Sequence, residues 1–416
     1  MTDEDRPNSP RYQSWIVLLL SLNFGILFFD RNALNFLMPF VQPDLGLSNT
    51  QVGILSSALS LTWAVSGFAV GRLSDRLGSR KPIIVIATVA FCACSLLSGI
   101  SHSFLMLLGA RLLMGAAEGG VMPISHSMIV IEVAPERRGL AMGVAQNLGS
   151  NLLGSGLAPI ILVPIAIAVG WRMGFYLAAI PGLITAALIW FTLREPQAGK
   201  AGTNEPTVTL QEAFAERNVL LCALMSILLV SYLVVCWTFM PLFLTNIRGF
   251  TPDMMSWLMA TLGISAGIGS FVVPAISDAV GRKPVFVAAC LLGLFLPLGA
   301  MYLTGSIWIL VLVFFFGWAL NGIFPLFMAT VPAESVDPRL TATLTGIVMG
   351  TGEVIGGVLS PLAAGAAADV YGLSAPLWMM FGLTALAVIC ALGLRETAPR
   401  VLAKRALLAG KPASVG

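Results

Sequence analysis

Two ionisable residues stand side by side in an apolar stretch near the N-terminus. The stretch NFGILFFDRNALNFLMPF covers residues 23–40 and contains Asp30 and Arg31. A charge near a bilayer centre costs about 2.5–3.5 kcal/mol on insertion scales, so ionisable residues there generally bind ions or substrates or move protons. The other ionisable residues deep in apolar segments are Arg111, Glu118 and Glu353.

These charges cannot neutralise their own neighbours. Adjacent helical residues point about 100° apart, so Asp30 and Arg31 face different directions. Arg111 and Glu118 share a helix face but lie roughly 10 Å apart along the axis. Each charge therefore needs a partner on another helix, a water-filled cavity or a ligand. The alternative to a functional role is a buried pair between helices, such as Asp30 with Arg111, that only fixes packing.

The composition is that of a protein embedded in lipid. The chain has 416 residues, of which 57% are hydrophobic and 10% charged, and its mean hydropathy is +0.90. A soluble protein carries about 25% charged residues, so this chain cannot cover its surface with polar groups. The formal net charge of +3 is small, and we expect no nucleic-acid partner.

Twelve apolar windows of about 20 residues, the length that spans a bilayer, follow one another along the chain. They cover 14–40, 50–71, 82–100, 103–131, 138–164, 171–193, 219–245, 252–276, 285–304, 306–331, 339–365 and 373–394. The predicted fold is an all-α polytopic membrane protein with two six-helix halves, 14–193 and 219–394. A linker (194–218) joins them, and the tails are 1–13 and 395–416. The polar start has no signal-peptide pattern, so the first window is expected to remain a span.

The basic residues predict the orientation. If both termini are cytoplasmic, 19 of the 23 lysines and arginines fall on cytoplasmic segments, as the positive-inside rule requires. We therefore expect a multi-pass protein of the cytoplasmic (inner) membrane.

The two halves repeat. The loop GRLSDRLGSRKP returns as PAISDAVGRKP, so that Asp75 matches Asp278. An offset of 202 residues pairs Gly115 with Gly317 and Pro123 with Pro325, but it pairs Glu118 with Leu320 and Arg111 with Val313. Such duplications are typical of secondary transporters, whose site lies between the repeats. Since the second copy lacks the charges, the fold does not require them.

The chain resembles the major facilitator superfamily over its full length. The resemblance rests on GRLSDRLGSRK, its second copy, and RLLMG at 111–115. The motifs DRNAL, RLLMGAAEGGVMP, GWRMGFY and GEVIGGVLSP are further similar to the anion:cation symporters. That resemblance implies that Asp30 and Glu118 couple protons and that Arg31 contacts an anionic substrate. Trp63 stands where that group usually has a substrate-contacting tyrosine. The Spinster-like lipid transporters share the acid and base motifs and are the nearest rival family.

The resemblance also implies that the repeated loop latches conformational states. The residues concerned are Gly71, Asp75, Arg76, Arg80 and Asp278. The alternative is a basic loop that serves only to orient the protein in the membrane.

Counting the deep charges suggests a mechanism. Two bases and three acids give a net charge of −1, so a carboxylate that binds Arg31 or Arg111 must displace an acid. The displaced acid, unpaired and away from water, should take a proton. Anion and proton would then move together, and import is the natural direction. Glu353 has two open roles, as a permanently protonated structural acid or as a further proton site.

Several polar and aromatic residues are candidates to line the pocket, with helix packing as the alternative for each: Trp63, Gln146, Asn147, Tyr232, Trp237 and Asn321. The six cysteines lack metal or redox spacing, and we expect neither metal nor cofactor. No nucleophile–base constellation predicts an enzyme. The predicted protein is a monomeric proton-coupled symporter of an organic anion. A drug or lipid exporter working by proton antiport and a non-transporting membrane sensor are the alternatives.

Overall fold

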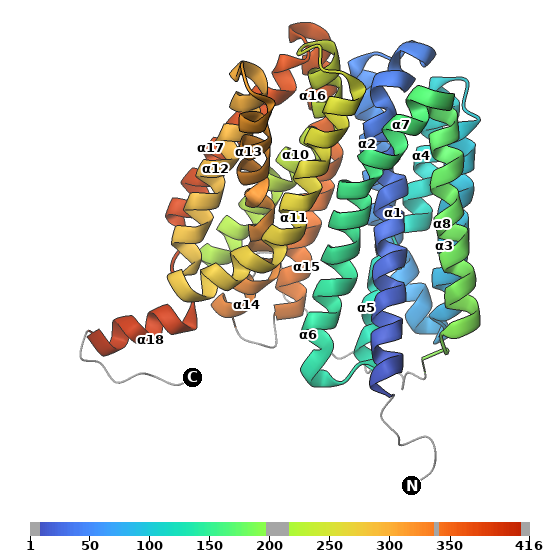
Figure 1. Ribbon diagram of the computed structural model, residues 1–416. Coiled ribbons are helices and arrows are strands. Elements are labelled where there is room, and N and C mark those ends of the chain that lie inside the picture. The colour runs from blue at the N-terminus through green and yellow to red at the C-terminus, as the bar shows by residue number, and fades with distance from the viewer. Residues whose placement is uncertain (1–8, 197–215, 337–340, 409–416) are drawn as a thin grey trace. The chain divides into compact units, whose positions relative to one another are not determined.

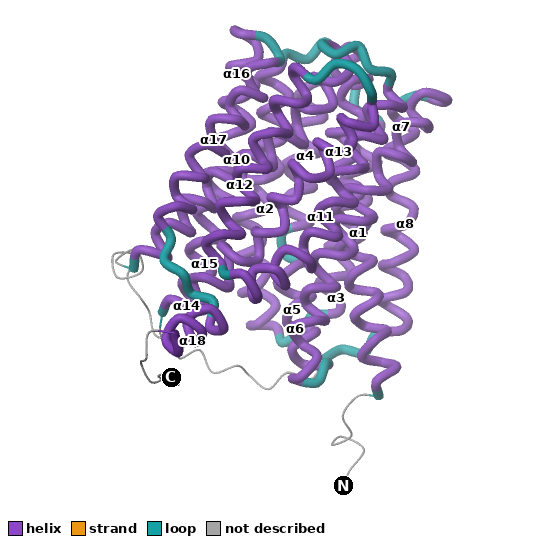
Figure 2. Tube along the Cα trace, turned by 60° about the vertical axis from the view of Figure 1, so that its left-hand side comes forward, coloured by secondary structure: helices purple, strands orange, loops and turns teal. Residues whose placement is uncertain are grey.

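All regular structure in the described part of the chain is helical. The structure is a computed structural model that describes residues 9–196, 216–336 and 341–408. Within these ranges, 12 helical segments are long and apolar enough to cross a membrane (Figures 1 and 2). Each predicted span overlaps one of them, which confirms the all-α polytopic fold. The side of the membrane that holds the termini stays a prediction.

Contacts divide the chain into two units. Unit 1 comprises Met1–Thr203 and Pro241–Ile264, and unit 2 comprises Asn204–Met240 and Ser265–Gly416. The helices of unit 1 are α1 (Pro10–Leu45), α2 (Asn49–Leu77), α3 (Lys81–Gly99), α4 (Phe104–Glu118), α5 (Val121–Glu132), α6 (Pro135–Gly143), η2 (Val144–Leu148), η3 (Ser150–Leu157), α7 (Ala158–Val169) and α8 (Trp171–Thr192).

The unit boundary runs through α10 (Arg217–Asn246) and α11 (Pro252–Val280). The remaining helices of unit 2 are α12 (Arg282–Tyr302), α13 (Ile307–Gly317), η4 (Trp318–Ile323), η5 (Leu326–Thr330), α14 (Val331–Ser335), α15 (Thr341–Thr351), η7 (Gly352–Leu359), α16 (Ser360–Tyr371), α17 (Ser374–Gly393) and α18 (Pro399–Leu408). The helix α18 lies in the stretch that the sequence predicts as a tail.

Four predicted spans are not continuous α-helices: those at 138–164 and 339–365 contain the π-helical segments η2, η3 and η7, and two others are broken differently. The span predicted at 103–131 is interrupted at Gly119 and Gly120, between α4 and α5. The span predicted at 306–331 passes through the 3₁₀-helix η4 and the π-helix η5. Apolar composition predicts only the length of a span, because a lipid-facing surface does not distinguish an α-helical turn from a wider or tighter one.

Two π-helical segments occupy the same register in the two repeats. The segment η3 begins at Ser150 and η7 begins at Gly352, which is again an offset of 202. Side chains donate hydrogen bonds to equivalent carbonyls within them: Asn32 Nδ2 to Gly154 O (3.1 Å) and Ser360 Oγ to Gly356 O (2.5 Å). Wide turns of this kind are frequent at functional sites.

Small residues bring α4 directly against α2. A Cβ atom at Gly115 would lie 2.3 Å from the carbonyl oxygen of Leu59, and one at Gly119 would lie 2.3 Å from that of Trp63. Only glycine permits this approach, which is how helices in membranes pack most closely. The contact fixes the end of α4, where Glu118 lies, beside the middle of α2.

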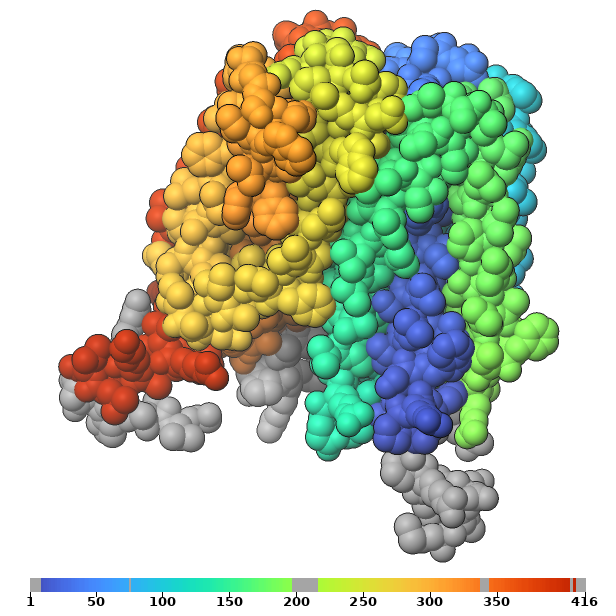
Figure 3. Space-filling model, viewed as in Figure 1, coloured from blue at the N-terminus to red at the C-terminus, as the bar shows by residue number. Residues whose placement is uncertain are grey.

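The helix α1 runs through unit 1 and carries two of the deep charges. It packs against α8 and against the π-helical segments η2 and η3 (Figures 1 and 3). Near its beginning, Trp15 Nε1 donates to Thr192 Oγ1 of α8 at 3.0 Å. Ser9 caps the helix by accepting from the backbone N–H of Tyr12, which supplies one of the bonds that the first turn lacks.

Candidate functional site: buried charges of unit 1

Asp30 is enclosed where α1 meets α3 and α8. Its side chain is 0% exposed. Ser95 Oγ of α3 donates to Asp30 Oδ1 at 2.5 Å, and the same hydroxyl lies 3.0 Å from the carbonyl oxygen of Phe175 in α8. Asp30 Oδ2 has no hydrogen-bond partner among the described residues. The carboxyl group is therefore held by one hydroxyl and half satisfied.

Arg111 is the buried cation of this region, at 1% exposure. It donates to the carbonyl oxygen of Arg31 and to Ser98 Oγ, both at 3.4 Å, and its guanidinium carbon lies 5.6 Å from the centre of the Phe175 ring. Asp30 is close enough to interact with it electrostatically, but the two form no ion pair within the described ranges. The described residues therefore show an electrostatic interaction between Asp30 and Arg111 but no direct ion pair.

Glu118 is an acid without a donor. It is 0% exposed, and neither carboxylate oxygen has a hydrogen-bond partner in the part of the chain that the structure describes. Arg31, Asp30 and Arg111 all lie within electrostatic range of it. An ionised carboxylate that is buried without hydrogen bonds is very unfavourable. In this conformation the Glu118 carboxyl group therefore has no hydrogen-bond donor among the described residues that would stabilise its ionised form.

Arg31 is the accessible charge of the group. Its side chain is half-buried, and its guanidinium carbon lies 5.4 Å from the ring centre of Trp63 and 5.6 Å from that of Phe28. Within the described residues, no acid or hydrogen-bond acceptor pairs with this guanidinium. The aromatic contacts orient the cation and leave its N–H donors available, so Arg31 has the environment of an anion-binding group.

The structure groups five of the residues that the sequence singled out: Asp30, Arg31, Trp63, Arg111 and Glu118. They come from α1, α2 and α4. Gln146 and Asn147 are half-buried in η2, a segment that packs on α1. Their contact with a substrate stays a prediction.

An aromatic cluster of unit 2 contains Tyr232, which lies 202 residues after Asp30. Tyr232 is 1% exposed and donates its hydroxyl to the Gly293 carbonyl at 2.9 Å. Its ring stacks on Trp318 at 5.9 Å between centroids, and Trp237 meets Trp318 edge-on at 5.3 Å. These contacts are those of packed interior residues. A substrate role for Tyr232 and Trp237 is unsupported by this geometry and stays a prediction.

Two further candidates lie in irregular segments of unit 2. Asn321 is half-buried in η4, and Glu353 is half-buried in η7. Both therefore sit where the helix departs from α geometry. The role of Glu353 stays open between the two accounts given above.

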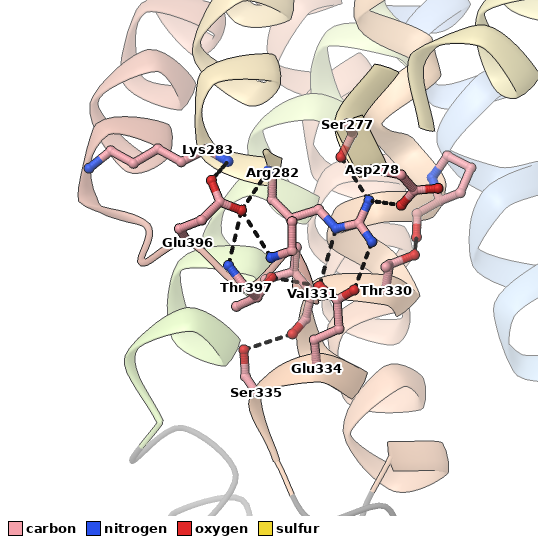
Figure 4. Close-up of polar contacts among 12 residues, drawn as sticks. Ser277, Asp278, Arg282, Lys283, Thr330, Val331, Glu334, Ser335, Glu396 and Thr397 are labelled. Atoms are coloured by element: carbon pink, nitrogen blue, oxygen red, sulfur yellow. Dashed lines mark hydrogen bonds and ion pairs between the residues drawn. The ribbon is translucent and has the colours of Figure 1, made fainter. Parts of the chain in front are cut away.

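A charged cluster ties together one end of unit 2 (Figure 4). Arg282 is 5% exposed and pairs with Asp278 at 2.6 Å and with Glu334 at 2.7 Å. Glu396 accepts from the backbone N–H groups of Arg282 (2.7 Å) and Lys283 (3.2 Å). A carboxylate at the beginning of α12 satisfies donors that the helix leaves unpaired and complements its dipole.

Unit 1 has the same arrangement of backbone and carboxylate. Glu195 accepts from the backbone N–H groups of Arg80 (2.6 Å) and Lys81 (3.1 Å), and Arg80 Nε donates to Ser127 Oγ. Of the other latch candidates, Gly71 is half-buried and Arg76 is exposed near the end of α2. The Asp75 side chain lies outside the described residues. Asp278 bonds within its own unit, and the latch itself stays a prediction.

Sequence reasoning missed several residues that hold these groups in place. Ser95 is hidden in the run CACSLLSG, where a serine has no distinguishing spacing. Glu195 and Glu396 carried a usable signal, because LRE at 193–195 returns at 394–396. The pairing of Arg282 with Glu334 depends on two helices meeting and has no local signal.

Comparisons with known proteins agree with this architecture. The sequence profile described as Major Facilitator Superfamily matches residues 20–250 and 220–415. The hexuronate transporter of Bacillus subtilis is 31% identical over 289 residues, which are 65% of this chain and 66% of that protein. A probable 4-methylmuconolactone transporter of Cupriavidus pinatubonensis is 27% identical over 266 residues, 62% of this chain and 61% of that protein. The alignments thus span about two thirds of these relatives.

The fold is also that of a solved transporter. An inward-facing, occupied structure of a bacterial homologue of the human lysosomal transporter Spinster superposes with a TM-score of 0.77. That match covers 98% of this chain and 100% of the other at 20% identity, so it bears on the fold alone. With the family profile matching both halves, the chain belongs to the major facilitator superfamily of multi-pass membrane transporters.

Proposed function

We propose that the protein imports an organic carboxylate together with protons across the cytoplasmic membrane. The observation that carries this proposal is the contrast between Arg31 and Glu118. Arg31 is a half-buried cation without an acid partner among the described residues, and Glu118 is a fully buried acid without a donor. One group is suited to an anion and the other to a proton.

Arg31 would receive the substrate. A guanidinium presents a planar fork of donors that matches a carboxylate. The ring of Trp63 supports one face of it, and the indole N–H can only donate. Trp63 in place of the usual tyrosine would therefore offer the substrate a donor but no acceptor.

Asp30 and Glu118 would carry the proton. A carboxylate that approaches Arg31 brings a second negative charge beside these acids, since Arg31 lies within electrostatic range of Glu118. Repulsion and loss of water both favour the neutral acid. Binding of the anion and uptake of the proton are thereby coupled, and release of either on the other side favours release of the second.

The relatives support a carboxylate as the substrate class. The Bacillus subtilis protein is named a hexuronate transporter, and a hexuronate is a sugar carboxylate. We accordingly propose a small carboxylate with several oxygen atoms, with sugar acids as the first candidates. We also propose that the protein acts as a monomer and without a cofactor.

The test is uptake into proteoliposomes that contain the purified protein. Labelled glucuronate, an uncharged sugar of the same size and a lysolipid are offered under an imposed proton gradient. We expect accumulation of the carboxylate when the outside is more acidic, and its loss when a protonophore is added. Accumulation only under the opposite gradient would indicate antiport, and uptake of the lysolipid alone would favour the Spinster-like alternative. Binding without uptake would favour a sensor.

A further inference from the structure

The hydroxyl group of Ser95 lies between two acceptors. It is 2.5 Å from Asp30 Oδ1 in α1 and 3.0 Å from the Phe175 carbonyl oxygen in α8. Ser95 is 0% exposed, so its hydroxyl group does not face bulk solvent. A serine hydroxyl has one proton to donate, and it can therefore satisfy only one of these acceptors fully at a time.

The choice depends on Asp30. When Asp30 is ionised, it is the stronger acceptor, because hydrogen bonds to a charged oxygen are about twice as strong as neutral ones. The Ser95 proton then points to α1. When Asp30 is protonated, its own O–H can donate to Ser95 Oγ, and the serine proton turns to the Phe175 carbonyl. The hydrogen bond thus moves from α1 to α8 as the acid gains a proton.

Phe175 links this switch to the buried cation. The carbonyl oxygen of Phe175 accepts a hydrogen bond from the Ser95 hydroxyl group, and the centre of its ring lies 5.6 Å from the guanidinium carbon of Arg111. The charged or titratable groups around Asp30 are Arg111 and Glu118 of α4, Cys92 and Cys94 of α3, and Arg31 on α1 itself. None of them donates a hydrogen bond to Asp30 within the described ranges, where Ser95 is the sole donor to this carboxyl group.

We propose that Ser95 is a positioning residue of the proton site: it stabilises ionised Asp30 and passes the protonation state of Asp30 on to α8. This inference rests on the proposed function, in which Asp30 carries a proton. It predicts that Ser95 sets the pH range over which Asp30 titrates and hence the pH range of transport.

The experiment replaces Ser95 in the full-length protein and follows Asp30 directly. Infrared difference spectra at a series of pH values report the protonated carboxyl band, and Asp30→Asn identifies the part of the band that belongs to Asp30. In Ser95→Ala the ionised acid loses its donor, so half-protonation should occur about one pH unit higher than in the wild type. The pH profile of glucuronate uptake should move in the same direction, and Ser95→Thr, which keeps the hydroxyl, should restore both.

The matched control is Ser125→Ala. Ser125 is also buried, at 3% exposure, but its hydroxyl donates only to Val121 O within its own helix. That variant should leave both profiles unchanged. Thermal unfolding of each variant shows whether it is folded, and if Ser95→Thr is overpacked, Ser95→Cys supplies a second variant with a weaker donor.

The outcomes separate this inference from the proposed function. An unchanged Asp30 band and uptake profile in folded Ser95→Ala would overturn the role of Ser95 while leaving Asp30 as the proton site. If Asp30→Asn itself removes no band and keeps proton-driven uptake, the proposed role of Asp30 is wrong, and the inference about Ser95 fails with it.

Discussion

The two units differ in the charged residues of their interiors, but they share a hydrogen-bonding arrangement at one end. In unit 1 the interior holds Asp30, Arg111 and Glu118, whereas the equivalent positions 202 residues later are Tyr232, Val313 and Leu320. Tyr232 bonds a backbone carbonyl and stacks on Trp318. At one end of each unit, by contrast, a glutamate bonds two successive backbone N–H groups in the same way. The repeated feature satisfies the backbone donors at the beginning of a helix, and the unrepeated charges are the ones that the proposed transport mechanism uses.

The largest effect should follow from removing the acid that unit 2 lacks. Glu118→Gln cannot release a proton, so we expect gradient-driven accumulation of glucuronate to vanish while exchange of internal for external substrate persists. With a gradient of about one pH unit and one proton per anion, the wild type should concentrate the substrate about tenfold. The variant should only equalise the internal and external concentrations. Leu320→Met, at the equivalent position of unit 2, is the control. Full accumulation by Glu118→Gln would assign coupling to another group.

The end of unit 2 should respond in stability rather than in coupling. Arg282→Ala leaves Glu334 without its cation, and breaking a buried pair costs about 3 kcal/mol or more. We expect a clear fall in the thermal unfolding temperature in detergent, with proton-to-substrate coupling retained in the folded fraction. Arg400→Ala, at an exposed position of α18, should leave that temperature unchanged. Equal temperatures for both variants would contradict a stabilising role for the cluster.

A smaller effect should come from Arg31→Lys, which keeps the positive charge at this position but replaces the planar guanidinium group by an ammonium group. The ammonium group has no planar fork and stacks less well on Trp63, so substrate affinity should fall about tenfold. Isothermal titration with glucuronate measures this directly. Arg172→Lys, which alters the half-exposed pair with Asp44, serves as the control. An affinity equal to that of the wild type would mean that Arg31 does not contact the substrate.

The smallest effect is expected at Glu353, a half-buried acid of unit 2 whose equivalent in unit 1 is not acidic. Glu353 corresponds to Asn151, so a neutral amide is already compatible with this position of the π-helical segment. We expect Glu353→Gln to keep most transport and the pH dependence of the wild type, as a protonated structural acid would. Uptake measured against external pH decides the matter, and a displaced optimum would place Glu353 in the coupling machinery.

The sequence predicted the helices more completely than the surroundings of the charges. Apolar windows predicted every span, and the cost of a buried charge was sufficient to single out Asp30, Arg31, Arg111 and Glu118. Ser95 escaped notice because a serine inside a span costs little, so its position carries no energetic signal. Trp63 drew attention only through a family pattern, and its contact with Arg31 depends on how α1 and α2 meet. The breaks at Gly119–Gly120 and in η4 likewise arise from packing between helices.

The paired π-helical segments also bear on how this chain arose. A widened turn costs backbone hydrogen bonds, and two unrelated insertions would rarely begin at matching positions. The segments η3 and η7 start 202 residues apart, and the carbonyl groups of the equivalent glycines Gly154 and Gly356 each accept a hydrogen bond from a side chain. The donor is Asn32 of α1 in the first copy and Ser360, one turn further along, in the second. The simplest history is that a single-copy ancestor already possessed the wide turn, that duplication doubled it, and that the two copies later evolved different ways to satisfy it. The divergence in charge between the units then belongs to the period after duplication.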